Sequence, residues 1–250
     1  MGQEVIVSVV MPAHNSARYI EKSIASVLNQ SFRDLELIIV DDSSTDNTLE
    51  ILERIAYNDN RVIILKNFIN LGCAISRNKA LLECKGRYIA FCDSDDIWEY
   101  EKLEKQIKYL KKNNFDMVFT AYEMINRDDK HIKFRNVPSE ILFDDLLKEN
   151  VVTFSSTLFK KEIIDGTIFK GQWFHEDYVF LLECIKKCRC FNGINEVLIK
   201  YRVHNRGRSF NKFRSAMFRW KIYRKFLGLN FVDSIYNFIN YIIYGIIKYF

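Results

Sequence analysis

Residues 88–98 read YIAFCDSDDIW, an apolar run that leads directly into three aspartates within four positions. A short apolar run bounded by polar residues is typical of a buried β-strand. Carboxylates this close together repel one another and are costly to remove from water. The aspartates therefore lie in a solvated turn or hold a cation, and the segments on either side help to distinguish the two.

Strand-like and helix-like segments alternate through the first 121 residues. Short β-branched or apolar runs predict five strands, at Val5–Met11, Leu35–Val40, Arg61–Leu65, Tyr88–Cys92 and Phe115–Ala121. Segments with apolar residues three and four apart predict the intervening helices, at Ser16–Asn29, Thr45–Tyr57, Cys73–Glu83 and Glu99–Asn113. This alternation with short connections indicates right-handed βαβ units and a mostly parallel sheet, so the expected fold class is α/β.

Three polar loops are expected to meet at one edge of this sheet, because ligands of such sheets bind beyond the carboxyl ends of the strands. The loops are residues 12–15, 41–46 and 93–96, and the last two are acidic. Acidic loops would repel an anionic ligand unless a divalent cation intervenes, and Mg²⁺ and Mn²⁺ bind carboxylate and phosphate oxygens. Asp93 and Asp95 are two positions apart, so both carboxylates can point toward one ion.

Two well-known phosphate-binding motifs are missing from the sequence. It contains no lysine-bearing phosphate loop, and no Gly-x-Gly-x-x-Gly follows the first strand. A nucleotidyltransferase that forms sugar nucleotides should carry a glycine-rich basic loop at that point, whereas residues 11–19 read MPAHNSARY. A metal ion that holds a diphosphate fits what remains.

The alternation stops after Ala121, and the second half predicts an α+β arrangement. It contains a polar hairpin or excursion at 122–137, a strand at Val151–Phe159, a helix at His175–Lys187 and a strand at Glu196–Tyr201. The chain is therefore expected to divide into three parts, residues 1–121, 122–210 and 211–250.

The third part combines basic, aromatic and apolar residues. The chain has a net charge of +5, and ten Lys or Arg with no acidic residue lie between Lys200 and Lys225. Residues 231–250 are apolar but interrupted by polar side chains, which favours an amphipathic helix in the plane of a membrane over a spanning helix. An anionic membrane surface is the expected partner, although a solvated basic face remains the alternative. No nucleic-acid partner is expected, because no recognition fold accompanies the basic run.

Several segments, in the right order, resemble the large inverting glycosyltransferase family 2, which has the GT-A fold. The strongest are residues 7–48, residues 70–81 (NLGCAISRNKAL) and residues 86–98 (GRYIAFCDSDDIW), and weaker matches follow at 174–180 (FHEDYVF) and 201–209 (YRVHNRGRS). The resemblance implies a Rossmann-like, nucleotide-sugar-binding part at 1–121 and an acceptor-binding, catalytic part at 122–210. The tail at 211–250 is expected to contact the membrane.

The resemblance implies a nucleotide-sugar site at Pro12, Ala13, Asn15, Asp42, Arg77, Asp93 and Ser94. Asp42 would accept a hydrogen bond from the N3–H of uracil, which favours UDP over other nucleoside diphosphates. Arg77 would reach the nucleotide or brace the aspartate loop. The alternative for Asp42 is an N-cap of the following helix, a role that Ser44 or Asp46 could also fill.

The resemblance also implies a Mn²⁺ or Mg²⁺ ion on the diphosphate, held by Asp95 with Asp93 and His204. His204 and Arg208 would contact the diphosphate itself. The alternative for the arginines near His204 is the membrane-facing basic run that begins there. Asp96 is expected to cap the helix from Glu99 or to face the acceptor.

The catalytic base implied by the resemblance is Asp177, which would take the proton of the attacking hydroxyl. Glu176 and Trp173 would bind the acceptor. The alternatives are structural: both acids would be favoured at a helix N-terminus by the helix dipole, and Trp173 could pack in the core.

The predicted function is transfer of a hexose, with inversion, from a UDP-sugar to a saccharide acceptor, lipid-linked through a diphosphate. The resemblance places it in bacterial O-antigen, lipopolysaccharide or capsule synthesis, at the inner face of the cell membrane. The six cysteines, with no secretory signal before them, favour reduced thiols in the cytoplasm. The alternatives are a nucleotidyltransferase and a non-catalytic module that binds nucleotide or lipid.

Overall fold

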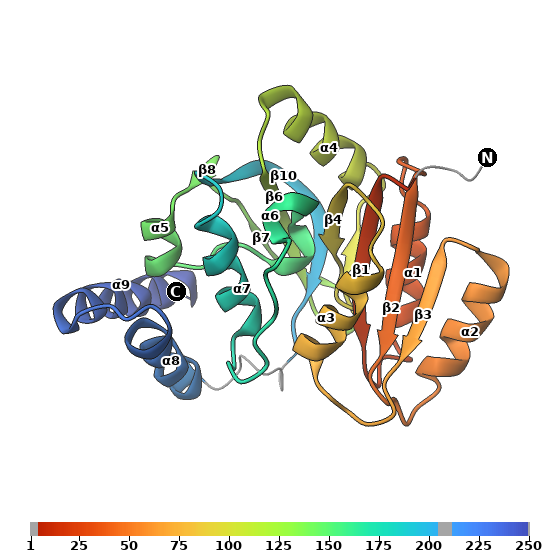
Figure 1. Ribbon diagram of the computed structural model, residues 1–250, viewed down its shortest axis with the longest axis horizontal. Helices are drawn as coiled ribbons and strands as arrows, with labels where there is room; N and C mark the ends of the chain where they lie inside the picture. The colour runs from red at the N-terminus through yellow and green to blue at the C-terminus, as the bar shows by residue number, and fades with distance from the viewer. Residues whose placement is uncertain (1–4, 205–211, 250) are drawn as a thin grey trace.

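The computed structural model describes residues 5–204 and 212–249 (Figure 1). Its described part contains one mixed sheet in the order β3-β2-β1-β4-β9-β6-β10-β5, with β7 paired to β6 and β8 paired to β10. Helices cover both faces of this sheet, and the C-terminal helices lie beside its second half. The fold class is α/β, as the sequence predicts.

The first half contains the first four strands and the four helices expected there, with small shifts at their ends. These elements are β1 (Val7–Ala13), α1 (Ile20–Leu28), β2 (Leu35–Asp41), α2 (Thr48–Asn58), β3 (Val62–Lys66), α3 (Cys73–Glu83), β4 (Tyr88–Phe91) and α4 (Lys102–Asn113). The four strands are parallel, with Val7 of β1 opposite both Leu35 of β2 and Tyr88 of β4. Their carboxyl ends therefore meet at one edge, which is the lower edge of the sheet in Figure 1.

The second half continues the sheet with short strands of both directions. Its elements are β5 (Ile97–Trp98), β6 (Met117–Ile125), β7 (His131–Arg135), β8 (Glu140–Ile141), α5 (Phe143–Lys148), the 3-10 helix η1 (Phe154–Ser156), β9 (Leu158–Lys160), α6 (Lys161–Ile164), α7 (Glu176–Ile185) and β10 (Phe191–Arg202). The hairpin expected at 122–137 is confirmed by β6 and β7. Since β9 is antiparallel to both β4 and β6, β6 runs in the direction of β4, and β10 runs parallel to β6.

The strand predicted at Val151–Phe159 is wrong over most of its length. Only Leu158–Lys160 pairs in the sheet, and a 3-10 turn precedes it. The hydroxyl of Ser156 donates to the carbonyl of Thr153 at 2.6 Å, and that of Thr157 donates to the carbonyl of Phe154 at 2.7 Å. Hydroxyls that bond to nearby backbone compete with the sheet, which is why a β-branched composition forms a turn here.

Two hydrophobic clusters pack on the two faces of the sheet. Alternate residues of one strand reach opposite clusters: Val10 belongs to the cluster that contains α7, and Val9 to the one that contains α1. The strands are buried on both faces, which explains why they read as continuous apolar runs rather than as alternating ones.

The C-terminal helices pack on the second half of the protein. They are α8 (Lys212–Lys221), the π-helical segment η3 (Ile222–Phe226) and α9 (Phe231–Tyr249). The hydroxyl of Tyr223 donates to the carbonyl of Leu147 at 2.5 Å, and the guanidinium of Arg219 lies 3.5 Å from the ring centroid of Tyr178. The basic run is thus not a uniformly solvated face, because Arg202 and Arg219 are buried. Among the described residues, no helix is both long and apolar enough to cross a membrane.

Lys102, the first residue of α4, is a fully buried cation behind the aspartate loop. Its Nζ donates to Oε1 of Gln106 at 2.7 Å and lies 3.8 Å from the ring centroid of Trp98. Burial lowers the pKa of this amine from its ordinary value to about 7.

The contribution of Lys102 to the free energy of unfolding should therefore rise with pH above about pH 7, against the opposite contribution of the buried cysteines, whose pKa values are raised. In this range the unfolded chain still binds the proton at Lys102 and the folded chain does not, so raising the pH favours the folded state by about 1 kcal/mol per pH unit. Lys102→Met should flatten this slope in urea titrations from pH 7 to 9. Lys108→Met, at an exposed position of the same helix, should keep the wild-type slope; equal slopes in the two variants would contradict the assignment.

Candidate functional site

The predicted site residues lie at or near the carboxyl edge of the sheet. Pro12 and Ala13 end β1, Asp42 follows β2, and Arg77 lies on α3. The stretch from Asp93 to Asp96 follows β4, the two acids Glu176 and Asp177 begin α7, and His204 follows β10. They come from segments far apart in the sequence, so the site exists only once the chain has folded.

Asp42 is buried and faces the segment that leads into α3. Its Oδ1 accepts from the side chain of Asn67 at 2.8 Å and from the N–H of Leu71 at 2.9 Å, and its Oδ2 accepts from the N–H of Gly72 at 2.7 Å. Burial alone would raise the pKa of Asp42, but these hydrogen bonds outweigh it and hold the pKa below its ordinary value.

The alternative of Asp42 as an N-cap of α2 is not adopted. Asp46 accepts instead from the N–H of Thr48, the first residue of α2, at 3.0 Å. Asp42 therefore keeps its carboxylate at the end of β2, next to the loop after β1.

Asn15 ties the loops after β1 and β2 together. Its N–H donates to the hydroxyl of Ser44 at 3.0 Å, and its side-chain oxygen accepts from the N–H of Thr45 at 2.8 Å. The backbone of Asn15 has φ of 49°, a left-handed conformation that asparagine tolerates better than most residues.

Asp93, whose side chain is 34% exposed, forms an ion pair with the buried Arg77. The Nη2 of Arg77 lies 2.6 Å from Oδ1 of Asp93, and the Arg77 side chain is 5% exposed. The guanidinium also lies 4.7 Å from the ring centroid of Phe154. Burial raises the pKa of Asp93, and the charge of Arg77 opposes that rise. Arg77 is expected either to reach the nucleotide or to brace the aspartate loop, and this contact with Asp93 is of the second kind.

Glu176 reaches the same arginine from the other half of the protein. Its Oε1 lies 4.0 Å from Nη1 of Arg77, and its side chain is buried. Asp177 is half-buried at the start of α7, where its Oδ1 accepts from the N–H of Tyr178 at 2.8 Å. The negative charge of Asp177 helps to raise the pKa of both Arg77 and Asp93. Asp177 is therefore close enough to the aspartate loop to interact with it electrostatically.

Asp95 contacts His204, the histidine expected beside it at the metal. The Nε2 of His204 lies 2.6 Å from Oδ2 of Asp95, and both side chains are a little over one quarter exposed. Between the two acids, the hydroxyl of Ser94 lies 2.8 Å from that of Ser16. Arg208 lies outside the described residues.

Asp96 does not cap the helix from Glu99, and α4 begins only at Lys102. Its carboxylate is fully buried and accepts from the backbone N–H of Arg202 at 2.9 Å. Burial raises the pKa of Asp96 well above its ordinary value. Asp96 thus fixes the end of β10 to the aspartate loop.

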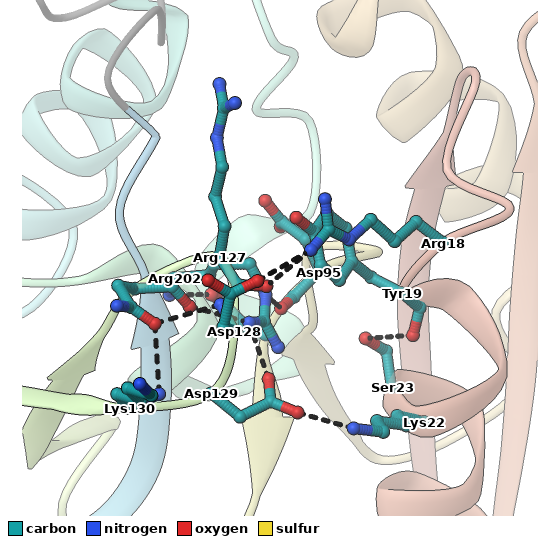
Figure 2. Close-up of polar contacts among 12 residues, drawn as sticks. Arg18, Tyr19, Lys22, Ser23, Asp95, Arg127, Asp128, Asp129, Lys130 and Arg202 are labelled. Carbon is teal, nitrogen blue, oxygen red and sulfur yellow. Dashed lines mark hydrogen bonds and ion pairs between the residues drawn. The ribbon is translucent and has the colours of Figure 1, made fainter.

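Arg202 is a site residue that the sequence analysis missed. Its Nε donates to the carbonyl of Asp95 at 2.9 Å, its Nη1 donates to the carbonyl of Asn126 at 2.9 Å, and its guanidinium lies 4.3 Å from the ring centroid of Tyr19 (Figure 2). The available signal was its place two residues before His204, on the same side of an extended strand end.

Trp173 packs against the protein itself. Its ring lies edge-on to that of Phe226, with centroids 5.6 Å apart, and it contacts the hydrophobic cluster of α7. This contact is the core packing that the sequence analysis gives as the alternative to acceptor binding for Trp173.

The residues at this edge fit a divalent cation that takes some of its ligands from the protein and the others from a bound diphosphate. Within residues 5–204 and 212–249, no three His, Cys, Asp or Glu side chains form a complete metal site. Asp95 and His204 offer one carboxylate and one imidazole, and Mg²⁺ sites commonly combine one or two carboxylates with substrate phosphates. The incomplete protein set is therefore the expected donor set for an ion that binds together with a nucleotide.

The model of the family described as Glycosyl transferase family 2 matches residues 8–169 of this chain. The chain belongs to glycosyltransferase family 2. A Bacillus subtilis (strain 168) protein named as a teichuronic acid biosynthesis glycosyltransferase, TuaG, is 35% identical over 237 residues and is covered over 94% of both chains. The Escherichia coli UDP-Glc:alpha-D-GlcNAc-diphosphoundecaprenol beta-1,3-glucosyltransferase WfgD is 36% identical over 247 residues, which cover 98% of this chain and 95% of WfgD.

Solved structures share the fold of this glycosyltransferase. The complex of Staphylococcus aureus TarS (residues 1–349) with UDP-GlcNAc matches with a TM-score of 0.72 at 19% identity, over 95% of this chain and 71% of that one. The mannosyltransferase PcManGT of Pyrobaculum calidifontis, in complex with GDP-Man and Mn²⁺, matches with a TM-score of 0.68 at 19% identity, over 90% and 64%. At such identities the likeness shows the fold, and it supports the GT-A architecture that the sequence predicts.

Removing Arg77 should destabilise the glycosyltransferase strongly. Arg77→Leu leaves Asp93 and Glu176 without their shared cation, so the free energy of unfolding in urea should fall by about 3–5 kcal/mol. Arg54→Ala is the matched control, because it breaks the largely exposed pair with Glu21 and should cost about 1 kcal/mol or less. Similar losses in the two variants would contradict the bracing role.

Proposed function

We propose that this glycosyltransferase transfers a hexose from a UDP-sugar to a saccharide on a lipid diphosphate, in the synthesis of a bacterial surface polysaccharide. The proposal is carried by the contact of Arg77 with both Asp93 and Glu176, which joins the expected donor loop to the expected acceptor helix. The substrate classes are supported by the relatives WfgD, a UDP-glucose-dependent glucosyltransferase, and TuaG, a teichuronic acid biosynthesis enzyme.

The donor is proposed to bind over β1, β2 and β4. Asp42 has its pKa held below the ordinary value, so it is a carboxylate at neutral pH and can only accept hydrogen bonds. The N3–H of uracil is a donor, which matches this acceptor. Pro12 and Ala13, at the end of β1, lie next to Asp42. Asn15 holds the loops after β1 and β2 together.

A Mn²⁺ or Mg²⁺ ion would be held by Asp95 and His204, and would stabilise the negative charge of the departing diphosphate. Asp93 is instead directed to Arg77, so its proposed part in this site is to fix the loop that carries Asp95.

Asp177 is proposed as the base. The acceptor hydroxyl oxygen forms a bond to the anomeric carbon, the bond from that carbon to the diphosphate oxygen breaks, and UDP leaves with its electron pair. The carboxylate of Asp177 takes the hydroxyl proton. Attack from the face opposite UDP converts an α-linked donor into a β-linked product.

Asp177→Asn should abolish transfer while leaving donor binding intact. An amide cannot take the proton, and general-base catalysis contributes about 10²–10⁴-fold, so kcat should fall by that factor and the Kd for UDP should stay within about twofold. The measurement is UDP release from a panel of UDP-sugars with Mn²⁺, with Mg²⁺ and with EDTA. Asp165→Asn, at an exposed position, is the control. Unchanged turnover in Asp177→Asn, or full activity in EDTA, would count against the respective assignment.

The C-terminal helices are proposed to dock this enzyme on the inner face of the cell membrane. One face of α9 exposes apolar side chains at spacings of three and four residues: Phe231, Val232, Ile235, Tyr236, Ile239, Ile242, Ile243 and Ile246. The opposite face carries the buried Ser234 and Asn237. Exposed Lys221, Arg224 and Lys225 precede α9, and this positive charge matches an anionic lipid surface.

Replacing two residues of this face by acids should release the enzyme from lipid. The double variant Ile239→Glu, Ile243→Glu should not float with vesicles of anionic phospholipid. Inserting charged side chains into the membrane interface costs free energy, and the anionic lipid repels them. Leu82→Glu, at an exposed apolar position on α3, should float like the wild type. Flotation of the double variant, or equal recovery of the wild type on neutral phosphatidylcholine, would contradict the proposed surface.

A further inference from the structure

The turn between β6 and β7 lies at the same edge as the aspartate loop. Ile125, the last residue of β6, is opposite Arg202 of β10, whose guanidinium contacts the carbonyl of Asp95. The turn, residues 126–130, therefore follows β6 at the carboxyl edge, next to the proposed metal ligands (Figure 2).

The backbone of this turn is fixed by its first residue. The side-chain oxygen of Asn126 accepts from the N–H of Asp128 at 2.9 Å and from the N–H of Lys130 at 3.0 Å. Asp129 has φ of 62°, which completes the reversal of the chain. A side chain that satisfies two backbone donors closes a turn in one conformation.

Both acids of the turn are neutralised by cations from other elements. Arg18, just before α1, pairs with Asp128 at 2.8 Å, and Lys22 of α1 pairs with Asp129. Arg202 pairs with Asp129 from β10 at 2.6 Å. The turn is thus fastened to α1 and to β10, and its negative charges are already compensated.

Arg127 lies in this fastened turn and, among residues 5–204 and 212–249, its guanidinium has no carboxylate partner. Its side chain is exposed and makes no hydrogen bond or ion pair with the residues that the structure describes. Figure 2 shows it extending away from the turn, beyond the level of Asp95, whereas Lys130 lies at the other end of the turn. The fixed turn thus carries an exposed guanidinium beside the carboxylates of the aspartate loop.

We propose that Arg127 binds a phosphate of the acceptor diphosphate, an inference that rests on the proposed function. Arginine presents a planar pair of donors that matches phosphate oxygens. In the order of the sheet, β6 lies on the opposite side of β4 from β1 and β2, whose loops are the proposed donor site. Arg127 is therefore placed for the acceptor, and the enzyme prefers diphosphate-linked acceptors over phosphate-free glycosides.

The test compares two acceptors that carry the same sugar, one on an alkyl diphosphate and one on an alkyl chain without phosphate. Arg127→Ala should raise the KM for the diphosphate acceptor about tenfold or more, the effect of losing one charge-assisted contact. Its KM for the phosphate-free acceptor and for the UDP-sugar should not change. Arg127→Lys should recover part of the loss, and Lys130→Ala, which removes a charge from the same turn, should behave as the wild type.

Three results would overturn the role of Arg127. The first is an equal loss for both acceptors, and the second is a rise in the KM for the UDP-sugar, which would assign the residue to the donor diphosphate. The third is a wild-type enzyme that uses the two acceptors equally well, in which case the proposed transferase function stands without this residue. A wild type that transfers to neither acceptor from any UDP-sugar overturns the proposed function as well.

Discussion

The site depends on one buried cation between two carboxylates. Arg77 pairs with Asp93 of the aspartate loop and lies 4.0 Å from Glu176 at the start of α7. Arg77 and Glu176 are both buried, and burying either charge without an opposite charge nearby would cost much free energy. Since the two acids belong to different halves of the chain, this shared pairing fixes the distance between the expected donor loop and the expected acceptor helix.

The repulsion among the three aspartates of residues 93–96 is offset because each carboxylate contacts a different partner. Asp93 turns to Arg77, Asp95 to His204, and Asp96 to the backbone of Arg202. Only Asp95 remains both accessible and paired with a second metal-binding side chain. The sequence predicts that Asp93 and Asp95 point toward one ion, and in the structure Asp93 contacts Arg77 while Asp95 contacts His204. In the proposed function the remaining metal ligands would come from the diphosphate, which would couple metal binding to nucleotide binding.

Local patterns were enough for the first half of the fold but not for the contacts that shape the site. The apolar runs of β1, β2 and β4 are buried on both faces, so composition alone identified them. The run at 151–159 failed because hydroxyls bond to the backbone there, an effect that hydrophobic patterning does not register. The partner of Asp96 lies 106 residues away, and no short-range signal indicates it. Family resemblance named Asp42, Asp95 and His204, but only the fold shows what holds them.

The C-terminal helices pack directly against the segment that precedes α7, the helix that carries the proposed base. The ring of Phe218 in α8 stacks on that of Phe174, with centroids 5.0 Å apart, and Arg214 lies 4.6 Å from the same ring. Phe174 precedes Glu176 by two residues, so α8 and the start of α7 form one packed unit. An acceptor held by a lipid has its diphosphate at the membrane interface and can present its sugar only to a site close to that interface. In the proposed function, the exposed apolar face of α9 would bring the enzyme to that interface and Arg127 would bind the acceptor phosphate there.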